Sequence, residues 1–293
     1  MMTKRHLNIL IVSFLVLGLN EFIGGAASFS GRFQNAESKQ PIRLRVLSYN
    51  ILGGRNIDGS RNLNRIAKVI NEIRPDLVSL QEVDRKTARM NGIDIPVVLS
   101  KLTGMNFVFG GAMDYDGGEY GVAILSKIPV ETYKNYPLPH SKNREPRTAL
   151  AAKLKWVDQS HEIIFISTHL DHKESPNDRI TQANEINKII AQYKNSRVIL
   201  AGDLNCTPQS QPMAILLKEF KDTWKSQQDG FTFPSKEPTK RIDYILHDEQ
   251  NPWSVTNVYT GPEINSSDST WHTLLKITSD HLPLIADLEL QVK

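Results

Sequence analysis

The feature that most constrains this chain is a series of apolar runs of strand length, several of which end in polar residues. Segments 43–51, 76–83 and 197–204 have the length and the Val, Ile and Leu content of buried strands. In segment 62–73, apolar residues recur at spacings of three and four, which predicts an amphipathic helix. A chain that mixes such strands and helices is predicted to fold as an α/β protein.

The rest of the chain extends this pattern. Further helices are predicted at 95–102 and 176–193, and further strands at 106–109, 120–126, 130–136, 148–156, 162–168, 242–247, 253–259 and 282–290. Two mixed, largely antiparallel sheets packed face to face, with helices outside, would bury all of these apolar stripes. Because no linker or low-complexity stretch interrupts the pattern, we expect one catalytic domain over 42–293.

The N-terminal segment has the pattern of an export signal. Lys4 and Arg5 precede the apolar run LNILIVSFLVLGL, and the small residues Gly25, Ala26 and Ala27 follow. This order predicts a signal peptide over 1–27, a polar lead-in over 28–41, and a secreted or periplasmic protein. Retention of the apolar run as an anchor is the alternative.

Composition excludes several classes of protein. Lys plus Arg is 35 and Asp plus Glu is 32, so the formal charge of +3 gives no strong signal of nonspecific DNA binding. The single cysteine, Cys206, excludes an intramolecular disulfide framework and a Cys-rich zinc site. It directly follows Asn205, and we expect it to be a small packed residue rather than a nucleophile.

Polar side chains at strand ends are the candidate functional residues. They are Asn50, Glu82, His169, Asp203, Asn205, Asp243, Asp280 and His281. Each alone is better explained as a solvated strand end, a turn former or a satisfied histidine. Together they form a coherent set, because carboxylates with few soft ligands suit a hard cation such as Mg²⁺ or Mn²⁺. Imidazoles and carboxamides can stabilise a phosphoryl oxygen or move protons, so the set predicts metal-assisted hydrolysis of a phosphate ester.

With these residues the chain resembles the endonuclease/exonuclease/phosphatase superfamily, the DNase I-like phosphohydrolases. The motifs that carry the resemblance stand in family order: LSYNI, LVSLQEVD, EYGVAILSK, REPRTAL, STHLD, LAGDLN, RIDYIL and SDHLPL. The resemblance implies a four-layer α/β/β/α sandwich with the site at one edge of the two sheets.

The resemblance also implies roles. Glu82 would be the principal metal ligand, Asp280 would complete the metal region, and Asn50 would bind the metal shell or the phosphate. Some repair nucleases of the family carry an acidic residue two positions after this asparagine, where this chain has Leu52. That difference favours a single dominant ion at Glu82.

The remaining roles concern water and phosphate. Asp203 would activate the attacking water and Asn205 would hold a phosphate oxygen. His281, oriented by Asp243, would bind the scissile phosphate.

His169 would contact a phosphate oxygen or assist the leaving group, with Glu119 as its partner. Arg147 would neutralise phosphate charge.

The substrate stays open at this level, because a fold supports many activities. A phosphodiesterase or nuclease is the first expectation; a phosphatase or a phospholipase C-like enzyme on small metabolites or lipid headgroups is the second, and a non-catalytic binding module the third. Lys142, Arg144 and Arg147 could form a phosphate-binding rim or a solvated loop. Trp253 and Trp271 are expected to be core or loop anchors rather than stacking residues. Nothing predicts a stable protein partner, so we expect a monomer.

Overall fold

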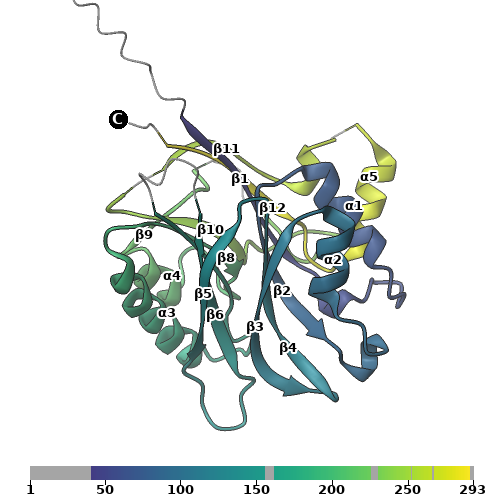
Figure 1. Cartoon of the computed structure of the whole chain (residues 1–293), viewed down its shortest axis with the longest axis horizontal. Helices are drawn as coiled ribbons and strands as arrows, with labels where there is room; N and C mark the ends of the chain where they lie inside the picture. Colours follow the sequence, from purple (N-terminus) through teal and green to yellow (C-terminus); the bar gives the residue numbers. More distant parts are fainter. Residues whose placement is uncertain (1–40, 156–161, 226–229, 252, 266, 291–293) are drawn as a thin grey trace, which may run out of the picture. The chain divides into compact units, whose positions relative to one another are not determined.

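Two six-stranded sheets lie face to face in the computed structural model, which describes residues 41–155, 162–225, 230–251, 253–265 and 267–290 (Figure 1). The first sheet has the strand order β11-β12-β1-β2-β4-β3. Its strands are β1 (Ile42–Asn50), β2 (Leu77–Arg85), β3 (Asn106–Tyr115), β4 (Gly118–Ser126), β11 (Ser254–Thr260) and β12 (Leu284–Leu290). The signal peptide and nearly all of the lead-in predicted from the sequence lie outside the described residues.

The second sheet has the strand order β5-β6-β7-β8-β10-β9. Its strands are β5 (Val130–Leu138), β6 (Arg147–Leu154), β7 (Ile163–His169), β8 (Arg197–Asp203), β9 (Phe220–Asp222) and β10 (Asp243–Asp248). Each sheet contains one parallel pair, β1 with β2 and β7 with β8, and its other neighbours are antiparallel.

Helices cover the outer face of each sheet (Figure 1). One side carries α1 (Leu63–Ile73), α2 (Ile95–Thr103) and α5 (Ser269–Thr278), and the other carries α3 (Asn177–Ile190) and α4 (Gln211–Leu216). Short 3-10 helices occur at Leu52–Gly54, Ala88–Met90, Ala191–Tyr193 and Gly261–Glu263. No helix in the described part of the chain is both long and apolar enough to span a membrane.

Three apolar cores hold these layers together. The central core lies between the sheets and includes Val46, Phe165 and Ile245, while each outer core lies between one sheet and its helices. Trp253 and Trp271 are 3% exposed and belong to these cores, as expected. The four-layer α/β/β/α sandwich is therefore confirmed.

Two helices and a strand were missing from the sequence prediction. The α5 helix begins at Asp268, whose carboxylate accepts hydrogen bonds from the backbone N–H of Thr270 and Trp271. This N-cap, followed by buried Trp271 and Leu275, was a usable signal. The α4 helix has six residues and β9 has three, too few for periodicity to reveal them.

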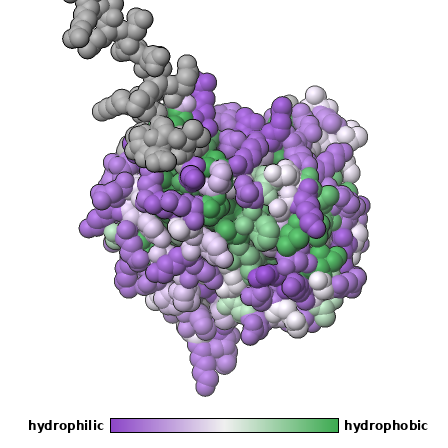
Figure 2. Space-filling model, in the orientation of Figure 1, coloured by the Kyte–Doolittle hydropathy of each residue, from purple (hydrophilic) through white to green (hydrophobic). Residues whose placement is uncertain are grey.

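The loop between β5 and β6 (139–146) projects at the lower edge of the view as a hydrophilic extension (Figures 1 and 2). Its Lys142 is exposed, and Arg144 lies 3.9 Å from Asp178. Arg147 follows at the base of the loop, where β6 begins, and is 3% exposed. The loop itself is therefore solvated. Of the predicted basic rim, Arg147 is the buried residue.

Candidate active site

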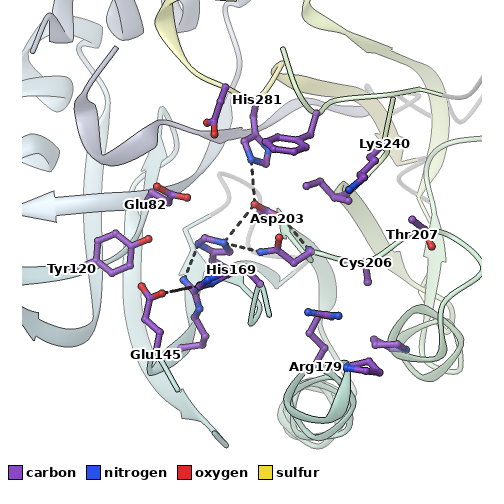
Figure 3. A pocket seen from close by; sticks show the side chains of 18 of the residues that line it. Glu82, Tyr120, Glu145, His169, Arg179, Asp203, Cys206, Thr207, Lys240 and His281 are labelled. Carbon is purple, nitrogen blue, oxygen red and sulfur yellow. Dashed lines mark hydrogen bonds and ion pairs between the residues drawn. The ribbon is translucent and has the colours of Figure 1, made fainter. Parts of the chain in front are cut away.

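The polar strand ends predicted from the sequence meet at one edge of the two sheets (Figure 3). His169 and Asp203 end the parallel strands β7 and β8 and are register partners. Asp243 begins β10 and is the antiparallel register partner of Asp203. Asn50 ends β1 in the other sheet, beside the β2 segment that carries Glu82.

Asp203 lies at the centre of this group. Its Oδ2 accepts a hydrogen bond of 3.1 Å from Asn50 Nδ2 and lies 3.5 Å from His169 Nε2 and 3.6 Å from His281 Nε2. Its Oδ1 accepts a bond of 2.9 Å from the backbone N–H of Asn205. Contacts from both sheets therefore fix this buried carboxylate.

Irregular backbone conformations set the direction of two side chains, those of Glu82 and Asn205. Glu82 has a φ of +54°, and the pairing of β2 with β4 shifts register between Leu80 and Val83 around it. Asn205, just beyond β8, has a φ of +49°. Such left-handed residues and bulges are strained and redirect a side chain that a regular strand would point elsewhere.

Burial makes the carboxyl group of Asp203 a weaker acid than that of an exposed aspartate. Loss of solvation raises its pKa to about 7, and the nearby charge of Asp243 adds to the rise, while His281 opposes it. At neutral pH this carboxyl group can therefore exchange a proton readily, which is the property of a general base.

His281 carries positive charge at neutral pH. Burial alone would lower its pKa, but the charges of Asp243 and Asp203 and the 2.9 Å hydrogen bond from its Nδ1 to Asp243 Oδ2 raise the pKa to about 10. The ring of Phe233 packs against it with centroids 4.9 Å apart. An oriented imidazolium therefore faces the same cleft as Asp203.

His169 is neutral. Burial lowers its pKa well below the usual value, and the charge of Arg147 lowers it further. Arg147 Nη1 can only donate, so His169 Nδ1 accepts this 3.1 Å bond and the imidazole proton lies on Nε2. That N–H faces Asp203 Oδ2, and Asn205 Nδ2 lies 3.0 Å from the same nitrogen.

Glu82 and Asp280 form a second group of charges, here called the acidic pair. Burial raises the pKa of Glu82; the hydrogen bond from Asn50 Nδ2 (3.1 Å) lowers it, and the charge of Asp280 raises it again. Both carboxylates line the cleft. Oxygen donors with excess negative charge are what a hard divalent cation requires.

A second set of potential ligands lies close by. Atoms of Asp203, Asp243 and His281 lie within 4.8 Å of one another. The Asp203 oxygens and His281 Nδ1 are already hydrogen-bonded, whereas Asp243 Oδ1 has no hydrogen-bond partner among the described residues.

Glu119 is not brought to His169. Its carboxylate lies 3.2 Å from Arg85 Nη1 and is 43% exposed, while Arg147 and Asn205 contact the two ring nitrogens of His169. Tyr120, one residue later, is the cleft residue. Successive side chains of a strand point to opposite faces, so an offset of one residue selects the wrong side chain.

The cleft has a volume of about 940 Å³, and its walls come from both sheets. Several lining residues were not predicted from the sequence: Arg89, Met113, Tyr115, Tyr120, Glu145, His172 and Arg179. Glu145 and His172 contact Arg147 Nη2 at 3.3 and 3.1 Å. A signal for these two was present in the motifs, since Glu145 lies within REPRTAL and His172 directly follows STHLD.

Solved structures share this fold. The mannosyl-6-phosphatase Bt3783 of Bacteroides thetaiotaomicron is 19% identical, with 84% of this chain and 99% of that chain covered and a TM-score of 0.65. The human Nocturnin catalytic domain with bound sulfate is 19% identical, with 85% and 94% covered and a TM-score of 0.64. Truncated Caenorhabditis elegans TDP2 is 22% identical, with 84% and 97% covered and a TM-score of 0.62.

The sequence match is independent of these folds. The model of the Endonuclease/Exonuclease/phosphatase family matches residues 47–281, which include Asn50, Glu82, Asp203 and His281. This family consists of phosphoric ester hydrolases and is typically dependent on a divalent metal. The chain therefore belongs to the Endonuclease/Exonuclease/phosphatase family and is a phosphoric ester hydrolase.

Proposed function

We propose that the protein hydrolyses a phosphodiester with a water molecule activated by Asp203 and a divalent cation, Mg²⁺ or Mn²⁺, held at Glu82 and Asp280. The observation that carries the proposal is the position of Asp203 Oδ2, within 3.6 Å of side chains from three separate strand ends or loops: Asn50, His169 and His281. A buried carboxylate surrounded by donors in this way suits proton transfer rather than fold stability alone.

Asp203 takes the proton of the attacking water. Its pKa of about 7 means that a substantial fraction is ionised at neutral pH while its basicity stays high. The Asn205 N–H and the Asn50 carboxamide hold the two oxygens, so the carboxylate is oriented before substrate arrives.

Charge on the phosphoryl group is met by donors already in place. The His281 imidazolium and the Arg147 guanidinium both line the cleft and supply positive charge. Both N–H groups of the Asn50 carboxamide are already donated, to Glu82 and to Asp203. Because these groups are fixed by buried contacts, little reorganisation is needed as negative charge develops.

The residues present fit a hard cation at the acidic pair. Both Glu82 and Asp280 offer oxygen ligands, and burial together with the charge of Asp280 raises the pKa of Glu82, so a bound cation would relieve that cost. When bound there, a divalent ion supplies Lewis-acid stabilisation of a phosphoryl oxygen.

The extent of the cleft supports a diester rather than a monoester as the substrate. Figure 3 shows Tyr120 and Lys240 on opposite sides of Asp203, and both line the same cleft. A cleft that continues on both sides of Asp203 suits a substrate with an organic substituent on each side of the phosphorus. The competing function is a phosphatase acting on a small phosphorylated metabolite, which the similarity in fold to a mannosyl-6-phosphatase favours.

The test is a substrate panel with metal control. Bis-p-nitrophenyl phosphate, p-nitrophenyl phosphate, single-stranded DNA, RNA, sphingomyelin and mannose 6-phosphate would be assayed with EDTA, and then with Mg²⁺ or Mn²⁺ added. We expect diester cleavage that EDTA stops and the metal restores. Turnover restricted to monoesters would overturn the diester proposal, and activity that persists in EDTA would overturn the metal.

We also propose that the protein is exported and acts as a monomer. Residues 1–27 support export by their sequence pattern. The full chain expressed in a bacterial host should be recovered from the periplasm or the medium with an N-terminus near Ser28, and light scattering should give the mass of one chain. Retention of residues 1–27 in the recovered protein would exclude cleavage.

A further inference from the structure

An exposed aromatic ring lies inside the cleft, at the end of a hairpin. The strands β3 and β4 are joined by Asp116 and Gly117, which have φ values of +48° and +76°, as a tight two-residue hairpin turn requires. Tyr115 precedes the turn and is 37% exposed, although it is a large aromatic residue. It lines the cleft together with Met113 and Tyr120.

Arg89, which also lines the cleft, holds this ring. Its guanidinium carbon lies 4.5 Å from the Tyr115 ring centroid, and its Nη1 donates to the Tyr115 hydroxyl at 3.3 Å. Two further bonds of 2.6 Å tie Arg89 to the fully buried carboxylate of Asp84. A planar cation stacked on an aromatic ring is a stabilising arrangement, so the ring is held in place.

The hairpin tip is also tied to the neighbouring segment. Asp116 Oδ2 accepts a hydrogen bond of 2.6 Å from the backbone N–H of Arg89, and its carbonyl oxygen accepts one of 2.8 Å from Ala88 N–H. An exposed tyrosine held by this many contacts has already lost most of its conformational freedom. Stacking of a ligand on it therefore costs little further side-chain entropy.

The ring is adjacent to the catalytic residues. Its centroid lies 5.9 Å from that of Tyr120, at an interplanar angle of 52°. Tyr120 is close enough to Glu82 for this carboxylate to raise the phenol's pKa, in addition to the larger effect of burial. Tyr115 is thus one ring away from Glu82, and all three residues line the same cleft.

We propose that Tyr115, Met113 and Arg89 form a subsite that binds the nucleobase of a nucleotide-containing ester, so that the substrate of this site is a nucleoside phosphodiester. The inference rests on the proposed function and names its substrate class. Base stacking on an aromatic side chain is tolerant of sequence and worth roughly 1–3 kcal/mol, so one ring can set a preference of ten-fold or more.

The chemistry of the subsite favours a base over an anion or a sugar. The charge of Arg89 is neutralised by Asp84, so it offers little to a second phosphate. A sugar needs polar partners for its hydroxyls, whereas Met113 offers a thioether and three of the Arg89 donor contacts are already made. A flat, polarisable group fits such a surface best.

The experiment compares three diesters that share the p-nitrophenolate leaving group: the thymidine 5′-ester, the abasic 2-deoxyribose 5-ester and the methyl ester. We expect the protein to show a KM for the thymidine ester about ten-fold lower than for the other two. Tyr115→Ala should remove that preference by raising the KM for the thymidine ester more than that for the methyl ester, and Tyr115→Phe, which keeps the ring, should retain it.

Tyr133→Ala is the matched control. Tyr133 is 58% exposed on β5, in the other sheet, and does not line the cleft. An equal loss for the thymidine and abasic esters would indicate a sugar site, and an equal loss for all three esters would indicate a structural or leaving-group role; either would overturn the proposal. No change in Tyr115→Ala would also overturn it. Failure of the unaltered protein to cleave any ester would refute the proposed function instead.

Discussion

The two groups of titratable residues at this edge of the sheets differ in how their charge is balanced. In the Asp203 cluster, defined as Asp203, Asp243, His169 and His281, each carboxylate faces an imidazole at 2.9 to 3.6 Å. In the acidic pair, burial and the charge of Asp280 raise the pKa of Glu82, while the hydrogen bond from Asn50 and the charges of His281 and Arg147 lower it.

In the first group the protein pairs each carboxylate with an imidazole, whereas in the second it leaves two carboxylates for a cation to pair. In the Asp203 cluster, a hydrogen bond of 2.9 Å joins His281 Nδ1 to Asp243 Oδ2, and both imidazoles lie within 3.6 Å of Asp203 Oδ2. In the acidic pair, burial and the charge of Asp280 make ionised Glu82 less favourable, a cost that a bound cation would lower. The proposed function therefore assigns proton transfer to the Asp203 cluster and cation binding to the acidic pair.

The largest effect is expected from Asp203→Asn. The substitution keeps the shape of the side chain but removes its basicity, so kcat should fall by about 10³-fold. Activity would be measured at saturating Mg²⁺, and circular dichroism would establish that the fold is retained. A folded variant with near wild-type kcat would show that another group activates the water.

Glu82→Gln should distinguish the role of the acidic pair from that of the Asp203 cluster. Loss of the charged ligand should lower activity by about 10²-fold, because metal stabilisation of the transition state is worth several kcal/mol. In EDTA the variant should melt at the same or a higher temperature than the wild type, since repulsion with Asp280 is relieved.

The readout for the metal is the rise in melting temperature on addition of Mg²⁺. This rise should be lost in Glu82→Gln and kept in Asp243→Asn. The reverse result would place the ion at the alternative set of Asp203, Asp243 and His281.

Asp243→Asn should instead alter the pH profile. In the wild type the pKa of His281 is raised to about 10, so its cationic form persists through neutral pH and is lost only as pH rises through that value. Without the Asp243 charge the pKa falls toward its ordinary value. The alkaline decline of kcat/KM should therefore move to lower pH by ~1 unit or more, with a smaller loss, about ten-fold, at neutral pH. An unmoved alkaline limb would exclude His281 as the group that titrates there.

The sequence predicted the residues of the Asp203 cluster because a strand's end is where periodicity stops and polar side chains begin. Parallel strands then bring His169 and Asp203 together as a matter of geometry. It could not predict that Glu82 lies in a bulge with φ of +54°, since such strain depends on the surrounding sheet. Nor could it predict the surroundings of Glu119, which the family resemblance implied as the partner of His169 and whose carboxylate lies 3.2 Å from Arg85 Nη1.

The smallest effect is expected from hydrogen bonds that connect the β2 segment beside Glu82 to the strands of the Asp203 cluster. Ser79 Oγ lies 2.7 Å from Ser167 Oγ, donates to the Ala201 carbonyl at 2.9 Å, and accepts from Gln81 Nε2 at 2.7 Å. This bridge runs from the residue before Glu82 to the strands that carry His169 and Asp203.

Ser79→Ala leaves buried polar groups without partners, so the free energy of unfolding should fall by roughly 1–3 kcal/mol. If the bridge aligns the acidic pair with the Asp203 cluster, kcat should also fall a few-fold while the Mg²⁺-dependent rise in melting temperature is kept. Ser48→Ala is the control, because Ser48 is equally buried but its hydroxyl has no hydrogen-bond partner among the described residues. Unchanged kcat in a destabilised Ser79→Ala would mean that the bridge supports the sandwich alone and does not align the two groups.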